Sequence, residues 1–286
     1  MKNYILIIIS FFLITCDTIE PPYLQSNNQS SQKIVLIEKF TGHKCSNCPD
    51  ATRKIKELQE LYQDAIIPIS IHPGGLKEFT DTDDNYIYDF TTNSSDVIAS
   101  DMGASFLPLG TVNRIDGGIS NRCFTKDQWA SEIEKLLYDS EGLPRPKKFN
   151  IDISTVFNTT KKELTIETNI IALSDVKNNF NLVIIIIEDG IIAPQIDGTE
   201  FIESYEHNNI YRCAVNGTYG ENISNSNGLE NQFEYQSINT LILNQDANHN
   251  WTSDWDNINN CYVVAYIYET ESLIIQDSVK KAIIDE

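Results

Sequence analysis

The feature that most constrains this chain is a pair of cysteines, Cys45 and Cys48, in the sequence EKFTGHKCSNCPD. An apolar, β-branched run over residues 33–40 precedes the pair and predicts a buried strand. Residues 51–62 follow, with apolar side chains on one face of a helix. A cysteine at a helix N-terminus ionises more readily, because unpaired N–H groups and the helix dipole favour the thiolate. The order strand, cysteine pair, helix therefore predicts a redox site.

Two other interpretations of the cysteine pair stay open. It is a structural disulfide if the two thiols are permanently oxidised. It is half of a zinc site if two further ligands lie close by, but the sequence has no second CxxC motif and only His43 and His72 nearby. We therefore expect no metal. His43 and Lys44 stand just before Cys45 and are expected to add positive charge that favours its thiolate.

A later proline completes the predicted site. Residues 65–72, AIIPISIH, predict a second strand, and the stretch ASFLPLGTVNRIDGG holds Pro108 just before a predicted strand and turn. This order is similar to that of thioredoxins, in which a cis-proline lies against the CxxC motif. The resemblance implies an α/β thioredoxin-like domain over residues 33–140, with an insertion at about 73–104. It also implies that Pro108 shapes the substrate groove.

The sequence changes character after residues 141–148, EGLPRPKK, whose prolines and charges predict a hinge. Residues 149–286 contain several β-rich runs separated by turn residues, with alternating apolar and polar side chains in residues 163–170. Strands at this spacing without intervening helices predict an antiparallel all-β sandwich domain. Cys213 and Cys261 lie on or beside predicted strands and form a possible structural disulfide, the alternative being two buried thiols.

The N-terminal residues predict export and attachment to a membrane. Residues 1–16, MKNYILIIISFFLITC, carry one positive charge and an apolar run too short to span a bilayer, as is typical of a signal peptide. The segment LITC resembles the lipobox of bacterial lipoproteins, which implies cleavage before Cys16 and a lipid on that cysteine. An ordinary signal peptide with an incidental cysteine is the alternative. Residues 17–32 are rich in Pro, Asn, Gln and Ser and predict a flexible tether.

Composition narrows the range of partners. The chain has 286 residues, 41% of them hydrophobic, which is enough for two domains with cores of their own. Its formal net charge is -20, and residues 149–286 hold 21 acidic against 6 basic side chains. So acidic a segment argues against nucleic acid and anionic lipid surfaces as partners. The sequence has no Gly-rich phosphate loop, so we expect no cofactor. We expect Cys123 to be a small buried residue of the core.

Several stretches together are similar to one bacterial family. They are the lipobox and the sequences FTGHKCSNCPD, LPLGTVNR, NNIYRCAVNGTYGENI and NNCYVVAYIYETESLIIQDSVKKAI. They resemble the Omp28-related lipoproteins, a family named for an outer membrane protein of twenty-eight kilodaltons, over nearly the whole mature chain. The resemblance implies a thioredoxin-like domain followed by a β-rich domain, anchored by lipid at the periplasmic or cell-surface face of the outer membrane.

Two departures from ordinary thioredoxins concern the cysteine pair. No Trp precedes Cys45, and the dipeptide between the cysteines is Ser46-Asn47 rather than Gly-Pro. That dipeptide tunes the reduction potential, so the direction of exchange stays open.

The expected function is thiol-disulfide exchange with extracytoplasmic protein substrates or redox partners. In this reaction Cys45 attacks, Cys48 resolves the mixed disulfide, and Pro108 shapes the groove. The alternative is a non-enzymatic binding or adhesion lipoprotein. In that case the CxxC motif is a structural disulfide, and the β-rich domain or the 73–104 insertion holds a protein or glycan partner.

Overall fold

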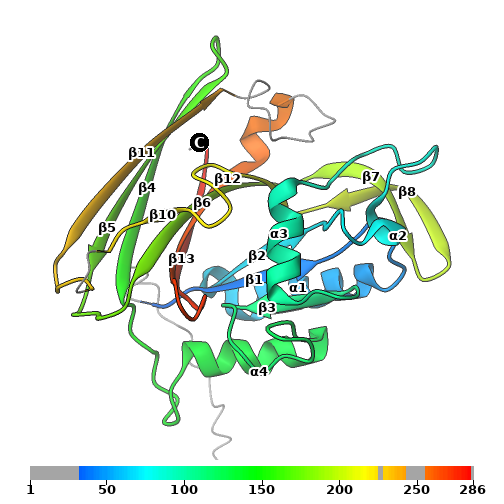
Figure 1. The fold of residues 1–286 in the computed structure, drawn as a ribbon. Helices are drawn as coiled ribbons and strands as arrows, with labels where there is room; N and C mark the ends of the chain where they lie inside the picture. The colour runs from blue at the N-terminus through cyan, green and yellow to red at the C-terminus, as the bar shows by residue number, and fades with distance from the viewer. Residues whose placement is uncertain (1–31, 225–227, 243–254, 285–286) are drawn as a thin grey trace, which may run out of the picture.

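The computed structural model describes residues 32–224, 228–242 and 255–284. Within these residues, eight strands form one mixed sheet that runs through the molecule (Figure 1). The strands are β1 Val35–Phe40, β2 Ile66–Ile71, β3 Leu109–Val112, β6 Phe180–Glu188, β9 Ile210–Ala214, β10 Glu221–Asn222, β12 Cys261–Glu269 and β13 Ile275–Ala282. Their order in the sheet is β13-β12-β6-β9-β2-β1-β3, and β10 pairs with β6.

This sheet contains strands from both predicted domains. β1 pairs with β2 in parallel and with β3 antiparallel. β2 then pairs in parallel with β9 at Ser70 and Ile210, and the strands from β9 through β6 and β12 to β13 are antiparallel. The sequence predicts two separate domains, whereas the structure joins their strands edge to edge. Periodicity reports which faces of a strand are buried but not which strand edges pair, so the sequence pattern could not predict this junction.

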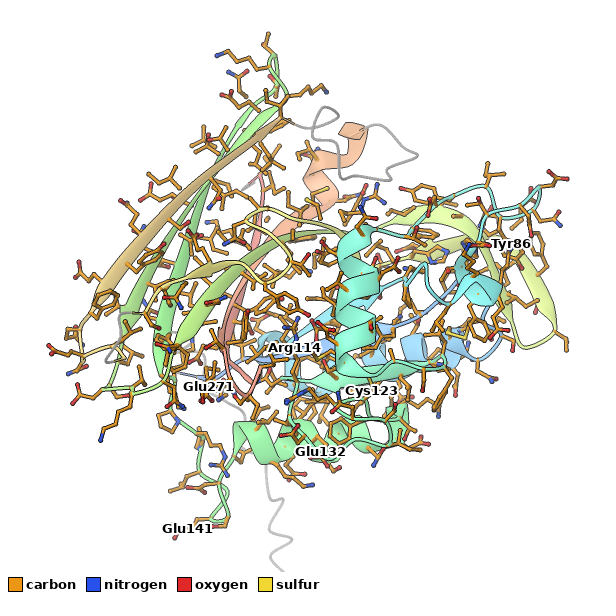
Figure 2. The ribbon with its side chains drawn as sticks, in the orientation of Figure 1. Tyr86, Arg114, Cys123, Glu132, Glu141 and Glu271 are labelled. Carbon is orange, nitrogen blue, oxygen red and sulfur yellow. A yellow bond between two sulfur atoms is a disulfide. The ribbon has the colours of Figure 1, made fainter. Side chains whose placement is uncertain are left out.

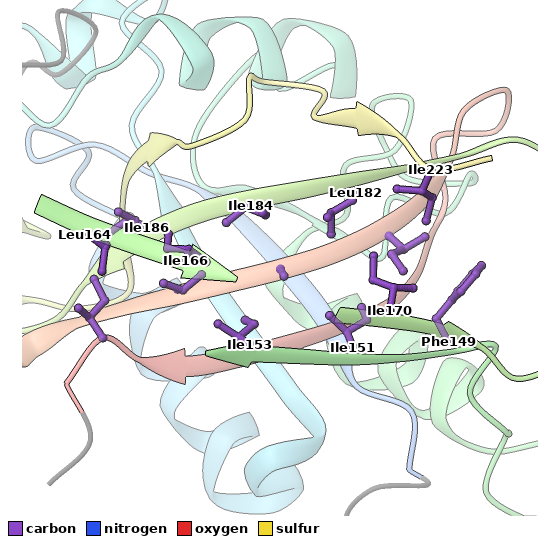
Figure 3. Close-up of a cluster of buried hydrophobic side chains, with 14 of the residues drawn as sticks. Phe149, Ile151, Ile153, Leu164, Ile166, Ile170, Leu182, Ile184, Ile186 and Ile223 are labelled. Atoms are coloured by element: carbon purple, nitrogen blue, oxygen red, sulfur yellow. The ribbon is translucent and has the colours of Figure 1, made fainter. Parts of the chain in front are cut away.

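The second segment also contributes a smaller sheet. Strands β4 (Phe149–Asn158), β5 (Glu163–Ala172) and β11 (Glu234–Ile242) form an antiparallel sheet in the order β11-β5-β4. Apolar side chains of β4 and β5 meet those of β6 and β12 in a core that includes Ile166 and Ile184 (Figure 3). The second segment is therefore β-rich, as predicted, and the larger of the two sheets that meet in this core continues into the first segment.

Helices of the first segment cover the part of the large sheet that β1, β2 and β3 form. The helices of this segment are α1 Cys48–Tyr62, η2 Gln63–Ala65, α2 Lys77–Thr80, α3 Asn93–Met102 and α4 Lys126–Leu137. The second segment has η3 Trp255–Asn260, whose Ile258 packs in the core of the smaller sheet. α1 and α4 pack on one face through Ile55 and Trp129. α3 packs on the other face through Ile98 and Met102. α2 and α3 lie within residues 73–104, the region in which the sequence predicts an insertion.

Strands β7 (Ile191–Asp197) and β8 (Glu200–His207) form a hairpin outside both sheets. The hairpin leaves the large sheet after β6 and returns to it at β9. Gly198, with a φ of +59°, begins the two-residue turn between the strands, a position that favours glycine. In Figure 1 the hairpin projects from the sheet on the side of α2.

Cys213 and Cys261 do not form the predicted disulfide. Both are buried thiols, Cys213 on β9 and Cys261 at the start of β12. β6 lies between these two strands and pairs with each of them. Two strand spacings amount to about 9 to 10 Å, whereas a disulfide needs Cα atoms within about 7 Å. Cys123 is buried as predicted, and its thiol donates to the carbonyl of Met102 at 3.2 Å.

The N-terminal predictions lie outside the described residues. They are the signal peptide over residues 1–16, the lipid on Cys16, and the tether as far as residue 31. Among the helices of the described residues, none has the length and apolar character needed to cross a membrane.

Candidate functional site

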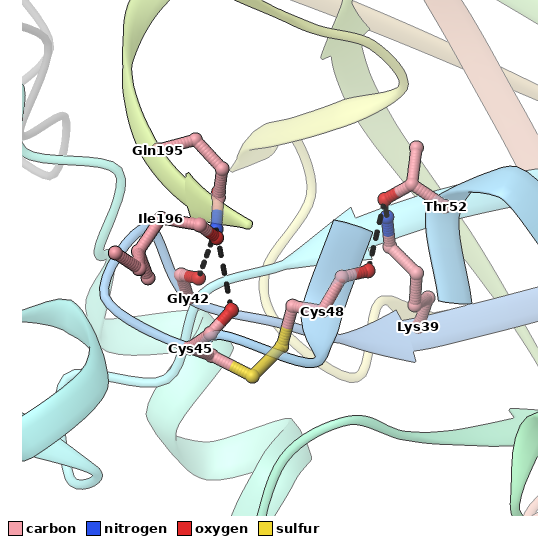
Figure 4. Close-up of a disulfide and its surroundings, with 7 residues drawn as sticks. All are labelled: Lys39, Gly42, Cys45, Cys48, Thr52, Gln195 and Ile196. Atoms are coloured by element: carbon pink, nitrogen blue, oxygen red, sulfur yellow. Dashed lines mark hydrogen bonds between the residues drawn. A yellow bond between two sulfur atoms is a disulfide. The ribbon is translucent and has the colours of Figure 1, made fainter. Parts of the chain in front are cut away.

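Cys45 and Cys48 form a disulfide at the start of α1 (Figure 4). Their Cα atoms are 5.4 Å apart; Cys48 is the first residue of the helix and Cys45 lies in the turn before it. Pro49 occupies the first turn of the helix, where its missing N–H leaves no hydrogen bond unmade. After reduction, the N-terminus of α1 would favour a thiolate here. The order strand, cysteine pair, helix is present as the sequence predicts.

The disulfide is buried in an apolar cluster. Cys45 is 2% exposed and Cys48 is 1% exposed, and both pack in one cluster with Leu107 and Leu109. These two leucines flank Pro108, and the Leu107–Pro108 peptide bond is cis. The structure therefore brings the cysteine pair and the Pro108 segment into the same core.

The β7–β8 hairpin lies against the loop that carries Cys45. The N–H of Ile196 donates to the carbonyl of His43 at 3.0 Å. The N–H of Gly198 donates to the carbonyl of Ser46 at 2.8 Å. These two bonds attach the turn of the hairpin to the loop on both sides of Cys45.

Gln195 makes the buried contact between the hairpin and the cysteine loop. Its side chain is 2% exposed, and its Nε2 lies 3.3 Å from the carbonyl oxygens of both Gly42 and Cys45 (Figure 4). At the surface, Asp197 forms an ion pair with Arg53 of α1 at 2.8 Å. The Asp-Gly dipeptide at 197–198 is a hairpin signal in the sequence. The sequence around the hairpin does not indicate that it contacts the cysteine loop, because Gln195 and Cys45 are 150 positions apart in the chain.

The hydroxyl group of Thr52 links the buried side chain of Lys39 to the backbone of Cys48. Lys39 on β1 is 5% exposed, and its Nζ donates to Thr52 Oγ1 at 2.7 Å (Figure 4). The Thr52 hydroxyl in turn donates to the carbonyl of Cys48 at 3.3 Å. Burial lowers the pKa of Lys39 to about 7, and repulsion from Lys56 adds to this effect. Lys39 stands in a mostly apolar stretch of the sequence, which predicts that its side chain is buried. Because burying a charged side chain is costly, such a lysine is a candidate for a functional role.

The positive charge before Cys45 is smaller than the sequence predicts. His43 is buried, and burial lowers its pKa, although its Nε2 lies 3.1 Å from the carbonyl of Asp81. Lys44 forms an ion pair with Asp83 at 2.7 Å. A neutral imidazole and a compensated ammonium group add little to the field at Cys45. The N-terminus of α1 therefore supplies most of the stabilisation expected for a thiolate.

His72 lies in an aromatic cluster. It is 2% exposed and stacks on Phe90 with ring centroids 4.6 Å apart, while His207 packs against the same Phe90 ring at 4.7 Å. Burial lowers the pKa of His72 well below its ordinary value and the pKa of His207 to about 3. Within the described part of the chain, no group of three or more His, Cys, Asp or Glu side chains could hold a metal ion.

The fold and the site define a β-rich protein with a buried CxxC disulfide, and a family comparison identifies its relatives. The family described as outer membrane protein Omp28 matches residues 95–286, which confirms the resemblance seen in the sequence. Because the match covers more than half of the chain, the protein belongs to the Omp28 family. The matched region begins after Cys45 and Cys48. No curated protein matches the sequence.

Three solved structures are similar to this chain, and the first of them shares its fold. HBP35 of Porphyromonas gingivalis is similar with a TM-score of 0.63 at 12% identity, covering 88% of this chain and 75% of that chain. A protein from Agrobacterium tumefaciens has a TM-score of 0.49 at 11% identity, covering 89% of this chain and 97% of that chain. A domain of the outer membrane lipoprotein Omp28 from Porphyromonas gingivalis has a TM-score of 0.31 at 18% identity, covering 51% of this chain and 95% of that chain.

Proposed function

We propose that this protein is a lipid-anchored outer membrane protein that exchanges disulfides with extracytoplasmic proteins through Cys45 and Cys48. The observation that carries the proposal is the Cys45–Cys48 disulfide at the N-terminus of α1, in one core with the Pro108 segment. Membership in a family of outer membrane proteins and the lipobox ending at Cys16 support the location and the anchor.

The order of elements supports a thioredoxin-like domain in the first segment. β1 leads into the cysteine pair and α1, and β2 then pairs with β1 in parallel. α3 follows, and β3 pairs with β1 antiparallel directly after Pro108 before α4 closes the segment. This is the order of strands and helices that the sequence predicts for such a domain.

The exchange reaction uses both cysteines in turn. In the reduced protein, the thiolate of Cys45 attacks one sulfur of a substrate disulfide, forming a mixed disulfide and releasing the other substrate sulfur as a thiolate. The thiolate of Cys48 then attacks the sulfur of Cys45, which breaks the mixed disulfide. The products are a substrate dithiol and the Cys45–Cys48 disulfide, so the substrate gains the two electrons that the protein loses. The reverse sequence of steps oxidises a substrate dithiol.

The burial of both cysteines requires that the site opens before it reacts. At 2% and 1% exposure, the two residues offer almost no surface to the thiol of another protein. The β7–β8 hairpin is hydrogen-bonded to the cysteine loop through the backbone N–H groups of Ile196 and Gly198 and the side chain of Gln195. We infer that displacement of this hairpin gives a substrate access to Cys45.

The same burial favours a second candidate function. A disulfide shielded from attacking thiols exchanges slowly and is typical of a structural bond. In that case Cys45–Cys48 holds the N-terminus of α1 in place, and the acidic β-rich segment or the insertion at 73–104 binds a protein or glycan partner. The two functions differ in the reduction potential that they require of the pair.

A redox titration of the chain without residues 1–16 separates these candidates. The protein is equilibrated in glutathione and dithiothreitol buffers, alkylated, and digested, so that Cys45 and Cys48 are read separately from the other cysteines. A midpoint between roughly -120 and -270 mV, the range of known oxidoreductases, supports exchange. A midpoint below about -300 mV contradicts exchange and supports a structural disulfide. Cys45→Ser, which cannot form the disulfide, is the control for complete labelling of Cys48.

A further inference from the structure

A cavity of about 180 Å³ is lined by residues of α1 and β13 and by Lys39 of β1. Three lysines border it, and they are Lys39, Lys56 of α1 and Lys280 of β13. Lys39 is buried, Lys280 is half-buried, and Lys56 is exposed to solvent. The cavity therefore connects the protein surface to a buried amino group.

Protein carboxylates compensate little of this positive charge. Among the described residues, no carboxylate forms an ion pair with Lys39 or Lys56. Asp189 also borders the cavity and pairs with Lys280 through one carboxylate oxygen at 3.7 Å, while its other oxygen accepts a hydrogen bond from the N–H of Asn209. The lining of this cavity thus holds three lysines and one aspartate, although the chain as a whole has a net charge of -20. Burial and repulsion from Lys56 lower the pKa of Lys39 to about 7, and the hydrogen bond from its Nζ to the uncharged Thr52 hydroxyl does not balance its charge.

A second, independent observation is an unpaired histidine next to the lysines. A smaller cavity of about 10 Å³ adjoins the first, and the two share Lys39, Thr52, Ser70 and Asn208. His72 borders this smaller cavity, is 2% exposed, and has no hydrogen-bond partner at either ring nitrogen among the described residues. A buried polar group without a partner is costly, so an acceptor atom that reached the smaller cavity would gain a hydrogen bond from His72.

We propose that this cavity binds a small oxyanion, of the carboxylate, phosphate or sulfate class, held by Lys39, Lys56 and Lys280. Ammonium groups form strong, charge-assisted hydrogen bonds with such oxygens. The volume corresponds to a few water molecules at roughly 30 Å³ each, which suits phosphate or a short dicarboxylate and excludes a nucleotide. The site does not depend on thiol-disulfide exchange, because it is assembled without either sulfur atom.

Isothermal titration calorimetry tests the site with three probes, inorganic phosphate, sulfate and malonate, each at constant ionic strength in a chloride-free buffer. We expect saturable binding of one anion per chain for at least one probe. Lys56→Gln and Lys280→Gln should each weaken this binding by at least about tenfold. Lys54→Gln is the matched control, because Lys54 lies on the same helix but is paired with Glu57, and it should leave the affinity unchanged.

Each outcome decides the proposal. If phosphate and sulfate bind and malonate does not, the ligand is an inorganic or esterified oxyanion; the opposite preference identifies a carboxylate. The absence of saturable binding for all three probes overturns the proposal. So does an equal loss of affinity in Lys54→Gln and Lys56→Gln, because binding would then reflect general attraction to lysines. Lys39→Met should abolish binding, and if that variant does not fold, Lys56→Gln and Lys280→Gln still decide.

Discussion

The guanidinium of Arg114 and the carboxylate of Glu38 form a two-point ion pair in the interior of the protein. Nε of Arg114 lies 2.9 Å from one carboxylate oxygen and Nη2 lies 2.5 Å from the other. Nη2 also donates to the hydroxyl of Tyr266 at 3.0 Å. Glu38 lies on β1, Arg114 follows β3, and Tyr266 lies on β12, so the network joins the two segments of the chain. Figure 2 labels Arg114 near the centre of the view.

Arg114→Met should lower the free energy of unfolding by about 3 to 5 kcal/mol, because it leaves Glu38 buried and unpaired. Urea denaturation followed by circular dichroism measures the loss. The double variant Glu38→Leu with Arg114→Met should regain most of it, since no buried charge then remains. Lys135→Met is the control; it removes an exposed pair with Glu132 and should cost less than about 1 kcal/mol. A loss for Arg114→Met no larger than that of the control would contradict the role assigned to the pair.

Gln195→Ala should speed reduction of the Cys45–Cys48 disulfide by about tenfold, because it removes a buried hydrogen-bonded contact that holds the hairpin closed. The rate is measured by adding a water-soluble phosphine, quenching with an alkylating reagent, and determining the mass of the peptide that contains both cysteines. Arg53→Ala, which removes the exposed ion pair with Asp197, should have a smaller effect.

Lys54→Ala serves as the control for the hairpin, because Lys54 lies on the same helix as Arg53 and pairs with Glu57 instead. It should leave the reduction rate unchanged. An unchanged rate in Gln195→Ala would mean that the hairpin does not limit access to the disulfide.

The free energy of unfolding should fall as the pH rises from about 4 to 6, because the buried carboxyl group of Asp277 keeps its proton to a higher pH in the folded protein than in the unfolded chain. Asp277 accepts hydrogen bonds from the N–H groups of Lys148 and Phe149 at 2.8 and 3.0 Å, and burial raises its pKa to about 6. Between the ordinary carboxyl pKa and 6, the folded protein holds a proton that the unfolded chain has released. The free energy of unfolding therefore falls as the pH rises through this window, by up to roughly 3 kcal/mol.

Asp277→Asn keeps the acceptor oxygen and removes the titration. Urea denaturation at several pH values between 4 and 7 should show wild type losing stability relative to this variant as the pH rises. Parallel stability curves for the two proteins would show that Asp277 titrates normally.

Lys39 should have the opposite dependence on pH. Its folded pKa of about 7 lies below the ordinary lysine value of 10.5. Between these values the unfolded chain holds a proton that the folded protein lacks, so the free energy of unfolding rises with pH by up to about 5 kcal/mol. In buffer without multivalent anions, Lys39→Met should lack this rise between pH 7 and 10. An identical rise in both proteins would show that Lys39 is not the group responsible.

Alkylation under denaturing, non-reducing conditions should label Cys213 and Cys261 and leave Cys45 and Cys48 unlabelled. The reason is that β6 separates β9 from β12, whereas Cys45 and Cys48 are already bonded. Peptide mass spectrometry reads each cysteine separately. A peptide pair linked through Cys213 and Cys261 would refute the strand order reported for the large sheet.

Local sequence patterns predicted the parts of this structure that depend on neighbouring residues. The strand before Cys45, the helix after Cys48 and the strand after Pro108 follow from periodicity and from proline placement, which act over a few residues. The alternation in residues 163–170 likewise predicted β5, because the two faces of a strand differ in burial.

Contacts between distant residues could not be predicted in this way. The junction of β2 with β9, the hairpin over Cys45 and the cavity at Lys39 each bring together residues from both segments of the chain. The expected Cys213–Cys261 disulfide was wrong for the same reason, because the number of strands between two cysteines is a property of sheet order. An alternating pattern carries no information about that order.

The hairpin that is bonded to the cysteine loop also bears on the order of events during synthesis. A chain grows from its N-terminus, so Cys45 and Cys48 emerge long before residues 191–207. During that interval the loop that carries Cys45 lacks the hydrogen bonds that Gln195, Ile196 and Gly198 provide. The two cysteines are therefore more accessible in the growing chain than in the folded protein, where they are 2% and 1% exposed. A disulfide formed early meets less of a barrier than one formed after the second segment has packed against the cysteine loop.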